Sequence, residues 1–452
     1  MPQPRLELRT LVANIVGTLI RQLLTLLSGL TLSVLVARIL GPEKNGMYAV
    51  AVLFTTLLVT LLNLGLGAAN VYFVARGDVS LRAARRVTMQ VWALLSGVGL
   101  LLGTGVLLFY RDLVLPNVPT AVGWLALAIF PLYLLQTFIM ALLHARQDFR
   151  SYNLALLTAS IAGLLAAAIA LIFFKGEVIG ALIALAVGFS LSVIIAWNAV
   201  SRHIDATQPA LPPAGYIGQA LRYSILSYIS NLITFFTYRI DVYLIGFFLG
   251  ATAVGIYAVA VQLAERIWTL SQAVSAVLLP RLAALHADEA TRLRLTPLMS
   301  RWVLLLTLLL SFAVALALWF MLVPLFGLAY ATALPAFFWI IPGIVTLSFA
   351  RVLTNDIAAR GRPEINGAIS FMGLIANVLI NLVAIPAMGI SGAALASSLS
   401  YTLIAVLALI AYVRISGQRP LLTLFAPHED WVLIRNLIQR ESGKRKAESG
   451  KH

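Results

Sequence analysis

The sequence predicts an all-α polytopic membrane protein with twelve transmembrane helices, arranged as two pseudo-symmetric six-helix lobes around a central cavity. Its 452 residues are 61% hydrophobic and only 11% charged, and the mean hydropathy is +0.96. Soluble chains are about half apolar and a quarter charged. The apolar residues form twelve runs long enough to cross a bilayer. A motif in the first half also recurs in the second, which indicates two related lobes.

The expected spans each approach or exceed the roughly 20 residues that a transmembrane helix needs. Short connections join most of them, and none of the expected outer connections is long enough to hold a domain. The spans are expected at residues 12–37, 47–74, 88–109, 121–143, 152–174, 177–200, 224–249, 254–280, 302–323, 333–358, 367–387 and 390–413.

The orientation follows from the 32 Lys and Arg residues, which exceed the 17 Asp and Glu and give a net charge of +15. The expected inner loops carry fourteen of these basic residues, and the outer loops carry four, namely Arg38, Lys44, Arg111 and Lys175. Because basic residues accumulate on the cytoplasmic side, both termini are expected in the cytoplasm. The positive charge then serves topology and contact with membrane lipids, and no nucleic-acid partner is expected.

The repeated motif defines the domain organisation. LGPEKNGMYAVAV at Leu40–Val52 matches LGATAVGIYAVAV at Leu249–Val261, at an offset of 209 residues. Each half has an even number of spans and starts from the same side, as in repeats related by an axis along the membrane normal. We therefore expect an N-terminal lobe at 1–200, a cytoplasmic linker at 201–223, a C-terminal lobe at 224–413 and a cytoplasmic tail at 414–452.

Four spans carry polar side chains every three or four residues, which places them on one helix face. Lipid does not accept such faces, so we expect them to converge on one central compartment. Ordinary packing seams between helices are the alternative reading. The polar faces comprise Asn14, Thr18, Arg21, Thr25 and Ser28 in span one; Thr56, Thr60, Asn63, Gly67 and Asn70 in span two; Ser224, Ser227, Asn231, Thr234, Tyr238 and Asp241 in span seven; and Gln262, Glu265, Thr269 and Gln272 in span eight.

Charged residues inside the spans favour a water-filled cavity, because an intramembrane charge is costly and usually functional. The intramembrane cations are all arginines, which stay charged and bind phosphate through a planar fork. Asp241 lies on the polar face of its span and needs a partner from another helix, for which Arg21 or Arg266 is expected. A structural ion pair remains the alternative, as does snorkelling to the surface for Arg351. The candidate substrate-binding residues are Arg21, Asn63, Asn231, Tyr238, Asp241, Glu265, Arg266, Gln272 and Arg351.

No pattern in the sequence indicates catalysis. Cysteine is absent, and the five histidines lie in expected loops or in the tail without the spacing of metal ligands. No glycine-rich phosphate-binding loop of the nucleotide-hydrolase kind is present. We therefore expect a protein that is not an enzyme and that needs no cofactor or metal, with H⁺ or Na⁺ as the candidate coupling ion.

Three motifs resemble a known family. They are GPEKNGMYA at Gly41–Ala49, RIDVYLIGFFLG at Arg239–Gly250 with GIYA at Gly255–Ala258, and GRPEIN at Gly361–Asn366 followed by IPAMGISGAA at Ile385–Ala394. Their order and spacing resemble the polysaccharide-transporter, or Wzx-type oligosaccharide flippase, family of the multidrug/oligosaccharidyl-lipid/polysaccharide exporter superfamily. The resemblance covers the chain to about Arg414.

This resemblance implies a flippase in the bacterial cell (inner) membrane. It would move a polyprenyl-diphosphate-linked oligosaccharide from the cytoplasmic to the outer leaflet by alternating access, for the synthesis of a cell-surface polysaccharide. A polysaccharide polymerase and glycosyltransferases are the further partners that it implies. The alternatives are a cation-coupled small-molecule or drug exporter and a lipid II flippase of the same superfamily. A membrane-embedded glycan polymerase or ligase would need a large outer loop, and the expected outer loops are short.

Overall fold

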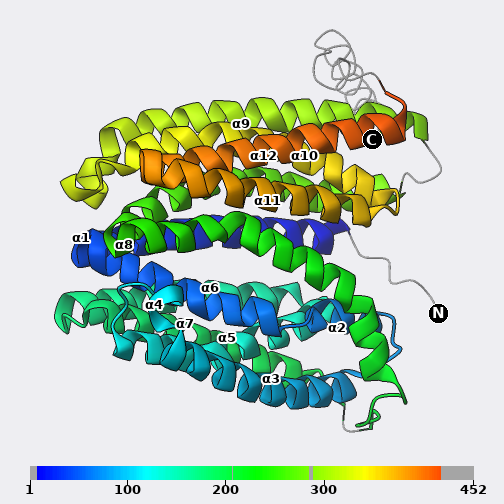
Figure 1. The fold of residues 1–452 in the computed structure, drawn as a ribbon. Coiled ribbons are helices and arrows are strands. Elements are labelled where there is room, and N and C mark those ends of the chain that lie inside the picture. The colour runs from blue at the N-terminus through cyan, green and yellow to red at the C-terminus, as the bar shows by residue number, and fades with distance from the viewer. Residues whose placement is uncertain (1–7, 206, 285–288, 419–452) are drawn as a thin grey trace, which may run out of the picture. The chain divides into compact units, whose positions relative to one another are not determined.

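In the computed structural model, the backbone of residues 8–205, 207–284 and 289–418 is described, together with the side chains outside 8–21, 226–227 and 269–284. Within these ranges the regular structure is helical, with no strand. The helices in chain order are α1 (Leu8–Leu62), α2 (Leu66–Ala75), α3 (Leu81–Phe109), α4 (Arg111–Val114), α5 (Thr120–Ala145), α6 (Phe149–Ala168) with a π-helical extension (Ile169–Phe173), α7 (Glu177–Arg202), α8 (Tyr216–Ala284), α9 (Glu289–Phe326), a 3₁₀ turn (Leu328–Tyr330), α10 (Ala333–Ala359), α11 (Pro363–Met388) and α12 (Ile390–Ser416) (Figure 1).

Two of these helices, α1 and α8, are hairpins of two helical arms. The helical conformation is interrupted at Gly41 (φ 74°, ψ 172°) in α1 and at Gly250 (φ 81°, ψ −177°) in α8. Glycine adopts such positive φ values without the steric cost of a Cβ atom. Both glycines hold the same place in the repeated motif, at the offset of 209. The ribbon of α1 turns back at this point (Figure 1), so a single glycine replaces the short loop expected between spans.

Counting these hairpins as two spans each brings the number of crossings to twelve. In the described part of the chain, ten helices are long and apolar enough to cross a membrane, including the 41-residue stretches Gln22–Leu62 and Tyr228–Trp268. A straight helix of that length would be about 60 Å long, twice the roughly 30 Å of a bilayer core. Each stretch contains its hinge glycine and therefore crosses twice. The prediction of an all-α protein with twelve transmembrane helices is confirmed.

The second expected span, at 47–74, is divided in the structure. The second arm of α1 ends at Leu62 and α2 begins at Leu66. Between them Leu64 and Gly65 have φ values of 48° and 68°, which a continuing right-handed helix does not allow. The side-chain carbonyl of Asn63 accepts a hydrogen bond from the Gly65 N–H at 2.7 Å. Asn63 therefore satisfies a backbone group that the break leaves without a helical partner.

The described chain falls into two compact units. Among the described residues, unit 1 comprises those up to Gln262 together with Leu318–Phe337 and Val378–Ala394, and unit 2 comprises those from Leu263 to Ala317, Phe338–Asn377 and those from Leu395 onward. Unit 1 therefore includes ends of helices from the second half of the sequence. The boundaries that the repeat suggested, at 200 and 224, stay a prediction about the lobes.

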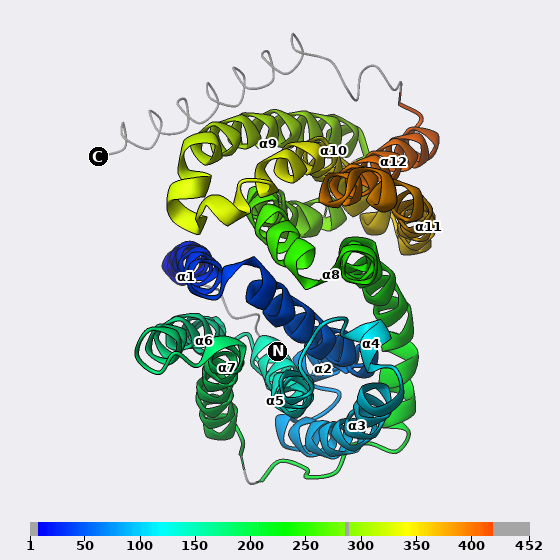
Figure 2. The same cartoon turned by 60° about the vertical axis from the view of Figure 1, so that its left-hand side comes forward.

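Unit 1 is built on α5, which packs against both α3 and α7, while α6 packs along α7 (Figure 2). The core side of α5 carries Phe130, Leu134 and Phe138, all fully buried. Between α6 and α7 the backbones approach closely, because a Cβ atom on Gly188 would lie 2.5 Å from the Ala159 carbonyl oxygen. Small residues allow this close packing where lipid supplies no hydrophobic driving force.

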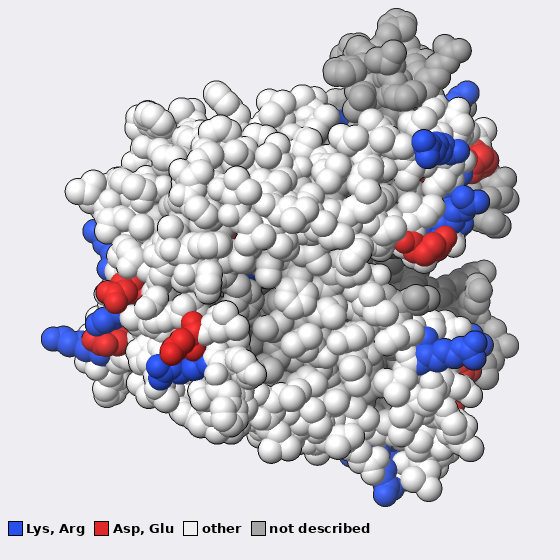
Figure 3. Space-filling model, in the orientation of Figure 1, with Lys and Arg blue, Asp and Glu red and all other residues white. Residues whose placement is uncertain are grey.

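Unit 2 has its core where α9, α10 and α12 meet. Val303 of α9 packs on Val352 of α10, and Tyr412 of α12 packs with Phe349 and Leu353 of α10. On the face drawn in Figure 3, charged side chains gather toward the ends of the helices, and the helix sides between them are uncharged. Such uncharged sides are what a lipid-facing helix requires.

Candidate functional site

The two copies of the repeated motif cross each other inside unit 1. A Cβ atom on Gly46 would collide with the backbone carbonyl of Ala251, and one on Gly255 would collide with that of Pro42. Gly46 matches Gly255, and Pro42 matches Ala251, at the offset of 209. The contact is therefore symmetric, and each copy supplies the glycine that lets the other copy's backbone approach. We call this contact the glycine crossing.

Polar contacts surround the glycine crossing. The side-chain amide of Asn45 donates to the Gly255 carbonyl at 3.0 Å. The Tyr330 hydroxyl donates to the Ala37 carbonyl at 3.0 Å, and Arg38 donates to the carbonyls of Leu325, at 3.1 Å, and Pro324. These contacts join the hinge region of α1 to the end of α9 and to the turn after it. The distribution of basic residues predicts that this end of unit 1 faces the outside.

Asp241 is a buried acid on the first arm of α8, with 2% of its surface exposed. One carboxylate oxygen accepts the Val242 N–H at 2.8 Å, and the other accepts the hydroxyl of Tyr257 from the second arm. The sequence led us to expect an arginine partner, either Arg21 or Arg266. The structure shows a contact with a tyrosine across the hairpin, and an arginine partner stays a prediction.

Tyr257→Phe is expected to destabilise the protein by about 1.5–3 kcal/mol, because a buried carboxylate loses a charge-assisted hydrogen bond. Tyr48→Phe is the matched control, since Tyr48 is the equivalent residue in the first copy. There Leu32 stands in the place of Asp241, and Leu32 and Tyr48 both pack against the buried cluster that contains Val36 and Leu171. Thermal unfolding in detergent measures both variants, and equal melting temperatures would contradict a stabilising role for the Tyr257 hydroxyl.

The other candidates in unit 1 lie in different surroundings. Asn63 holds the break between α1 and α2, and next to it the Tyr228 hydroxyl of α8 donates to the Leu61 carbonyl at 2.7 Å. Asn231 is exposed and Tyr238 is half-buried, both on the first arm of α8. Contact of these residues with a substrate stays a prediction.

Part of the polar face of span two serves packing between helices. Asn70 is 1% exposed; its amide donates to the Thr88 hydroxyl at 3.0 Å, and its carbonyl accepts from the Tyr216 hydroxyl at 3.1 Å. Burial raises the pKa of Tyr216, which lies before the apolar stretch of α8. For Asn70 the alternative reading, a polar seam between helices, describes the contacts that the structure shows.

In unit 2, three candidates lie on neighbouring segments of α8 and α10. The guanidinium carbon of Arg351 lies 4.0 Å from the ring centroid of Trp268, within the range of a cation–π contact. Trp268 is one helical turn beyond Glu265 and two residues beyond Arg266, and both of these charged residues are half-buried. The structure thus brings Arg351 to the segment of α8 that carries Glu265 and Arg266. The side chains of Arg21 and Gln272 lie outside the described residues.

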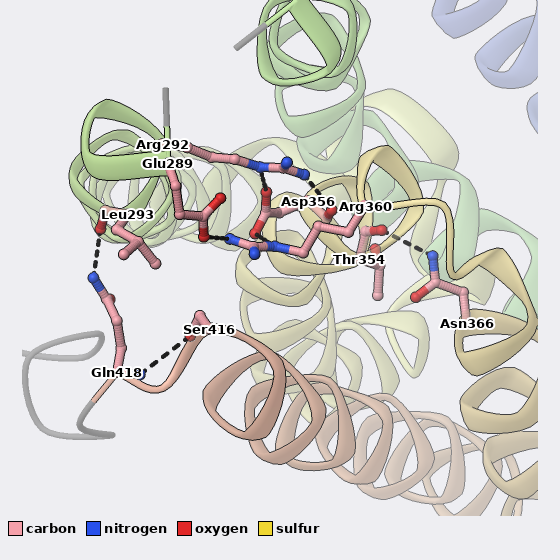
Figure 4. A network of polar contacts seen from close by, with 9 residues as sticks. All are labelled: Glu289, Arg292, Leu293, Thr354, Asp356, Arg360, Asn366, Ser416 and Gln418. Atoms are coloured by element: carbon pink, nitrogen blue, oxygen red, sulfur yellow. Dashed lines mark hydrogen bonds and ion pairs between the residues drawn. The ribbon is translucent and has the colours of Figure 1, made fainter. Parts of the chain in front are cut away.

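A charged cluster that the sequence did not reveal lies at one end of unit 2 (Figure 4). Asp356 is fully buried and bonds to Arg292 of α9, with Nε at 2.5 Å from one carboxylate oxygen. Arg360 bonds the other oxygen at 3.0 Å and reaches Glu289 at 2.7 Å. Burial by itself lowers the pKa of Arg360, but the hydrogen bonds and charges of Asp356 and Glu289 outweigh it and raise that pKa. Two arginines and two carboxylates make this cluster neutral.

The local sequence supports this cluster in two ways. Asp356 and Arg360 are four residues apart, a spacing that brings side chains together on a helix. Glu289 lies in the first turn of α9, where a negative charge is favourable. The contact with Arg292 joins positions 64 residues apart, and helix periodicity gives no signal for it.

This arrangement supports transport chemistry. Among the described residues no group of three or more His, Cys, Asp or Glu side chains could hold a metal ion. What the described chain does offer is a symmetric glycine crossing between the two motif copies, half-buried arginines inside transmembrane helices, and buried polar contacts that hold the hairpins. Half-buried guanidinium groups are suited to anionic headgroups, and a contact between repeated elements is suited to opening and closing.

Comparisons with known proteins agree with this reading. A family model described as polysaccharide biosynthesis protein matches residues 11–286, and no curated protein sequence matches the chain. The chain is similar to a solved structure of the lipid II flippase MurJ in an inward closed conformation, with a TM-score of 0.68 and 15% identity over 94% of this chain and 96% of that chain.

Two solved transporters extend the comparison. One is a multidrug resistance MATE family transporter of the MOP superfamily in an inward-facing conformation, with a TM-score of 0.62 and 16% identity over 89% of this chain and 98% of that chain. The other is a Vibrio cholerae MATE transporter, with a TM-score of 0.55 and 16% identity over 90% and 99%. The similar structures are a flippase and transporters, not enzymes. They show that the chain has the two-lobed fold of twelve helices.

Proposed function

Because the chain belongs to the polysaccharide biosynthesis protein family, we propose that it is a flippase for a polyprenyl-diphosphate-linked oligosaccharide. It moves this lipid from the cytoplasmic to the outer leaflet by alternating access. The observation that carries the proposal is the family match over residues 11–286, on a chain with the fold of a flippase and of transporters. The protein then acts in the bacterial inner membrane with both termini in the cytoplasm.

The contacts described above supply parts of such a mechanism. Arg266 and Arg351 bind the diphosphate, because guanidinium groups keep their charge inside a membrane and hold phosphate oxygens in pairs. A contact of Arg21 with the diphosphate is a separate expectation from the sequence, since its side chain lies outside the described residues. The glycine crossing is closed while the headgroup enters from the cytoplasm. It then separates to release the glycan on the outer side. The prenyl chain stays in lipid throughout, and H⁺ or Na⁺ binding at Glu265 or Asp241 is a candidate for the coupling step.

Arg21→Ala and Arg266→Ala are each expected to lower export of the surface glycan about tenfold or more, because each removes a charge-assisted contact to the diphosphate. Export is measured on whole cells at matched protein levels. Arg294→Ala is the control, since Arg294 is an exposed arginine of α9. Unchanged export in both Arg21→Ala and Arg266→Ala would contradict a role of these arginines in binding the diphosphate.

A deletion strain separates the proposal from its alternatives. We expect it to lose the surface polysaccharide and to accumulate the lipid-linked precursor on the cytoplasmic side. Increased drug susceptibility with normal polysaccharide would instead indicate a small-molecule exporter. Lysis with accumulation of lipid II would indicate a lipid II flippase.

A further inference from the structure

A pocket in unit 1 is separate from the arginines assigned to the diphosphate. It lies among α1, α2, α5, α6, α7 and the start of α8, and its volume is about 890 Å³. Pockets that hold small molecules have roughly 300–1,000 Å³. The end of α5 and the start of α6 border it, next to Arg146 and Arg150, so it lies toward the side assigned to the cytoplasm. The residues that matter below are Thr25, Tyr72, Tyr133, Gln136, Phe189 and Tyr223.

Flat aromatic surfaces line this pocket. The rings of Tyr133 and Phe189 stack with centroids 4.6 Å apart and planes at 13°. Those of Tyr72 and Tyr223 stack at 4.5 Å and 20°. Rigid aromatic faces present apolar area at low conformational cost. They match the C–H face of a pyranose ring, which is also flat and weakly apolar.

Hydrogen-bonding side chains line the pocket beside the aromatic rings. Gln136 is 6% exposed, and it lines the pocket together with Tyr133, which carries a hydroxyl. Thr25 is a further lining residue, and its hydroxyl is buried without a partner. Amide and hydroxyl groups in a pocket are the groups that bind the hydroxyls of a bound molecule.

The charge of the pocket selects the class of ligand. Among the described residues that line it there is no Asp, Glu, Lys or Arg. A diphosphate would find no counter-charge there, and neither would a cationic drug. We propose that this pocket binds an uncharged pyranose residue of the glycan. This inference rests on the proposed function and adds a specificity site to it, on the first half of the chain.

Binding of two probes to purified protein in detergent tests the inference. The probes are farnesyl diphosphate and farnesyl diphospho-N-acetylglucosamine, which differ only by the sugar. Wild-type protein is expected to bind the glycosylated probe about tenfold more tightly, as one or two additional hydrogen bonds and a stacking contact would give. Gln136→Leu is expected to abolish this preference and to leave the affinity for farnesyl diphosphate unchanged.

Two further variants make the test specific. Tyr133→Phe keeps the ring stack and removes one hydroxyl, so it is expected to reduce the preference without a change in folding. Ser96→Ala is the control, because the Ser96 hydroxyl is also buried without a partner but lies on α3, outside the pocket. Gln136→Leu is expected to melt close to the wild-type temperature, since leucine is an apolar side chain of similar size at a position that is 6% exposed.

The outcomes separate this inference from the function on which it rests. A wild-type preference that Gln136→Leu and Tyr133→Phe both retain would overturn the sugar pocket and leave the flippase standing. Equal binding of the two probes by wild type would overturn it as well. Failure of wild type to bind either probe would instead count against the proposed function.

Discussion

Replacing Gly46 or Gly255 with alanine is expected to abolish export of the surface glycan. A Cβ atom at either position would collide with a backbone carbonyl of the other copy of the motif, Ala251 or Pro42. Backbone atoms cannot move aside as the end of a flexible side chain can, so the glycine crossing cannot close. A transporter that cannot close its outer end cannot return to load substrate from the cytoplasm.

Gly97→Ala and Gly105→Ala are the matched controls for this prediction. Both glycines lie inside α3, and a Cβ atom at either would meet no atom within 4 Å. These control variants also replace a glycine with alanine inside a transmembrane helix. Unlike Gly46→Ala and Gly255→Ala, they cause no collision with a backbone carbonyl. Export by Gly46→Ala at the level of these controls would show that the glycine crossing has no role in transport.

A single-cysteine label reports the state of the glycine crossing directly, because the chain contains no cysteine. Asn45 is 6% exposed beside the crossing. Asn45→Cys is expected to react slowly with a membrane-impermeant maleimide added outside cells, and faster when combined with Gly46→Ala. Equal labelling rates in the two backgrounds would contradict a crossing held open by the added methyl group.

The second large effect is expected at Asp356. Asp356→Ala removes the carboxylate that pairs with Arg292 and Arg360 and leaves two arginines in a site where their side chains are 3% and 13% exposed. Breaking a buried ion pair in this way costs about 3–5 kcal/mol, because the remaining charge has lost its partner. The expected result is a much lower melting temperature in detergent and a reduced amount of protein in the membrane.

Two controls identify the reason for that loss. Glu289→Gln removes the half-exposed partner of Arg360 and is expected to cost less than about 1 kcal/mol, as exposed ion pairs do. The triple change Arg292→Met, Asp356→Leu and Arg360→Met removes the three buried charges, leaves only the half-exposed Glu289, and is expected to recover most of the stability. If Asp356→Ala melts like Glu289→Gln, the cluster does not stabilise unit 2.

The repeat in the sequence predicted the symmetric features of the fold. Gly41 and Gly250, which are 209 residues apart, form two equivalent hinges in the structure. Gly46 and Gly255, at the same offset, form the two sides of one contact. The absence of a loop between the arms was not predictable, because hydropathy locates apolar runs and not the φ value of a single glycine. The break near Gly65 escaped prediction for the same reason.

Contacts of the site residues were predictable only in part. Asp241 was expected to have an arginine partner from another helix, which stays a prediction, whereas its hydrogen bond with Tyr257 was not predicted. With the hinge at Gly250 known, Asp241 lies nine residues before it and Tyr257 seven after it, at similar depths of roughly 13 and 10 Å along the two arms. The pair of Asp356 with Arg292 depends on how α9 packs against α10, which periodicity within one helix does not encode.

The most direct test of the flippase proposal uses purified protein in proteoliposomes. The probe is a polyprenyl-diphosphate-linked oligosaccharide with a fluorophore on its glycan, in both leaflets, with membrane-impermeant dithionite added outside. With wild-type protein the fluorescence is expected to fall well beyond the share of the outer leaflet, because probe from the inner leaflet is carried outward. With Gly46→Ala protein, the fluorescence loss is expected to stop at the share of the probe that starts in the outer leaflet. Fluorescence loss that is the same in vesicles with and without wild-type protein would contradict the account.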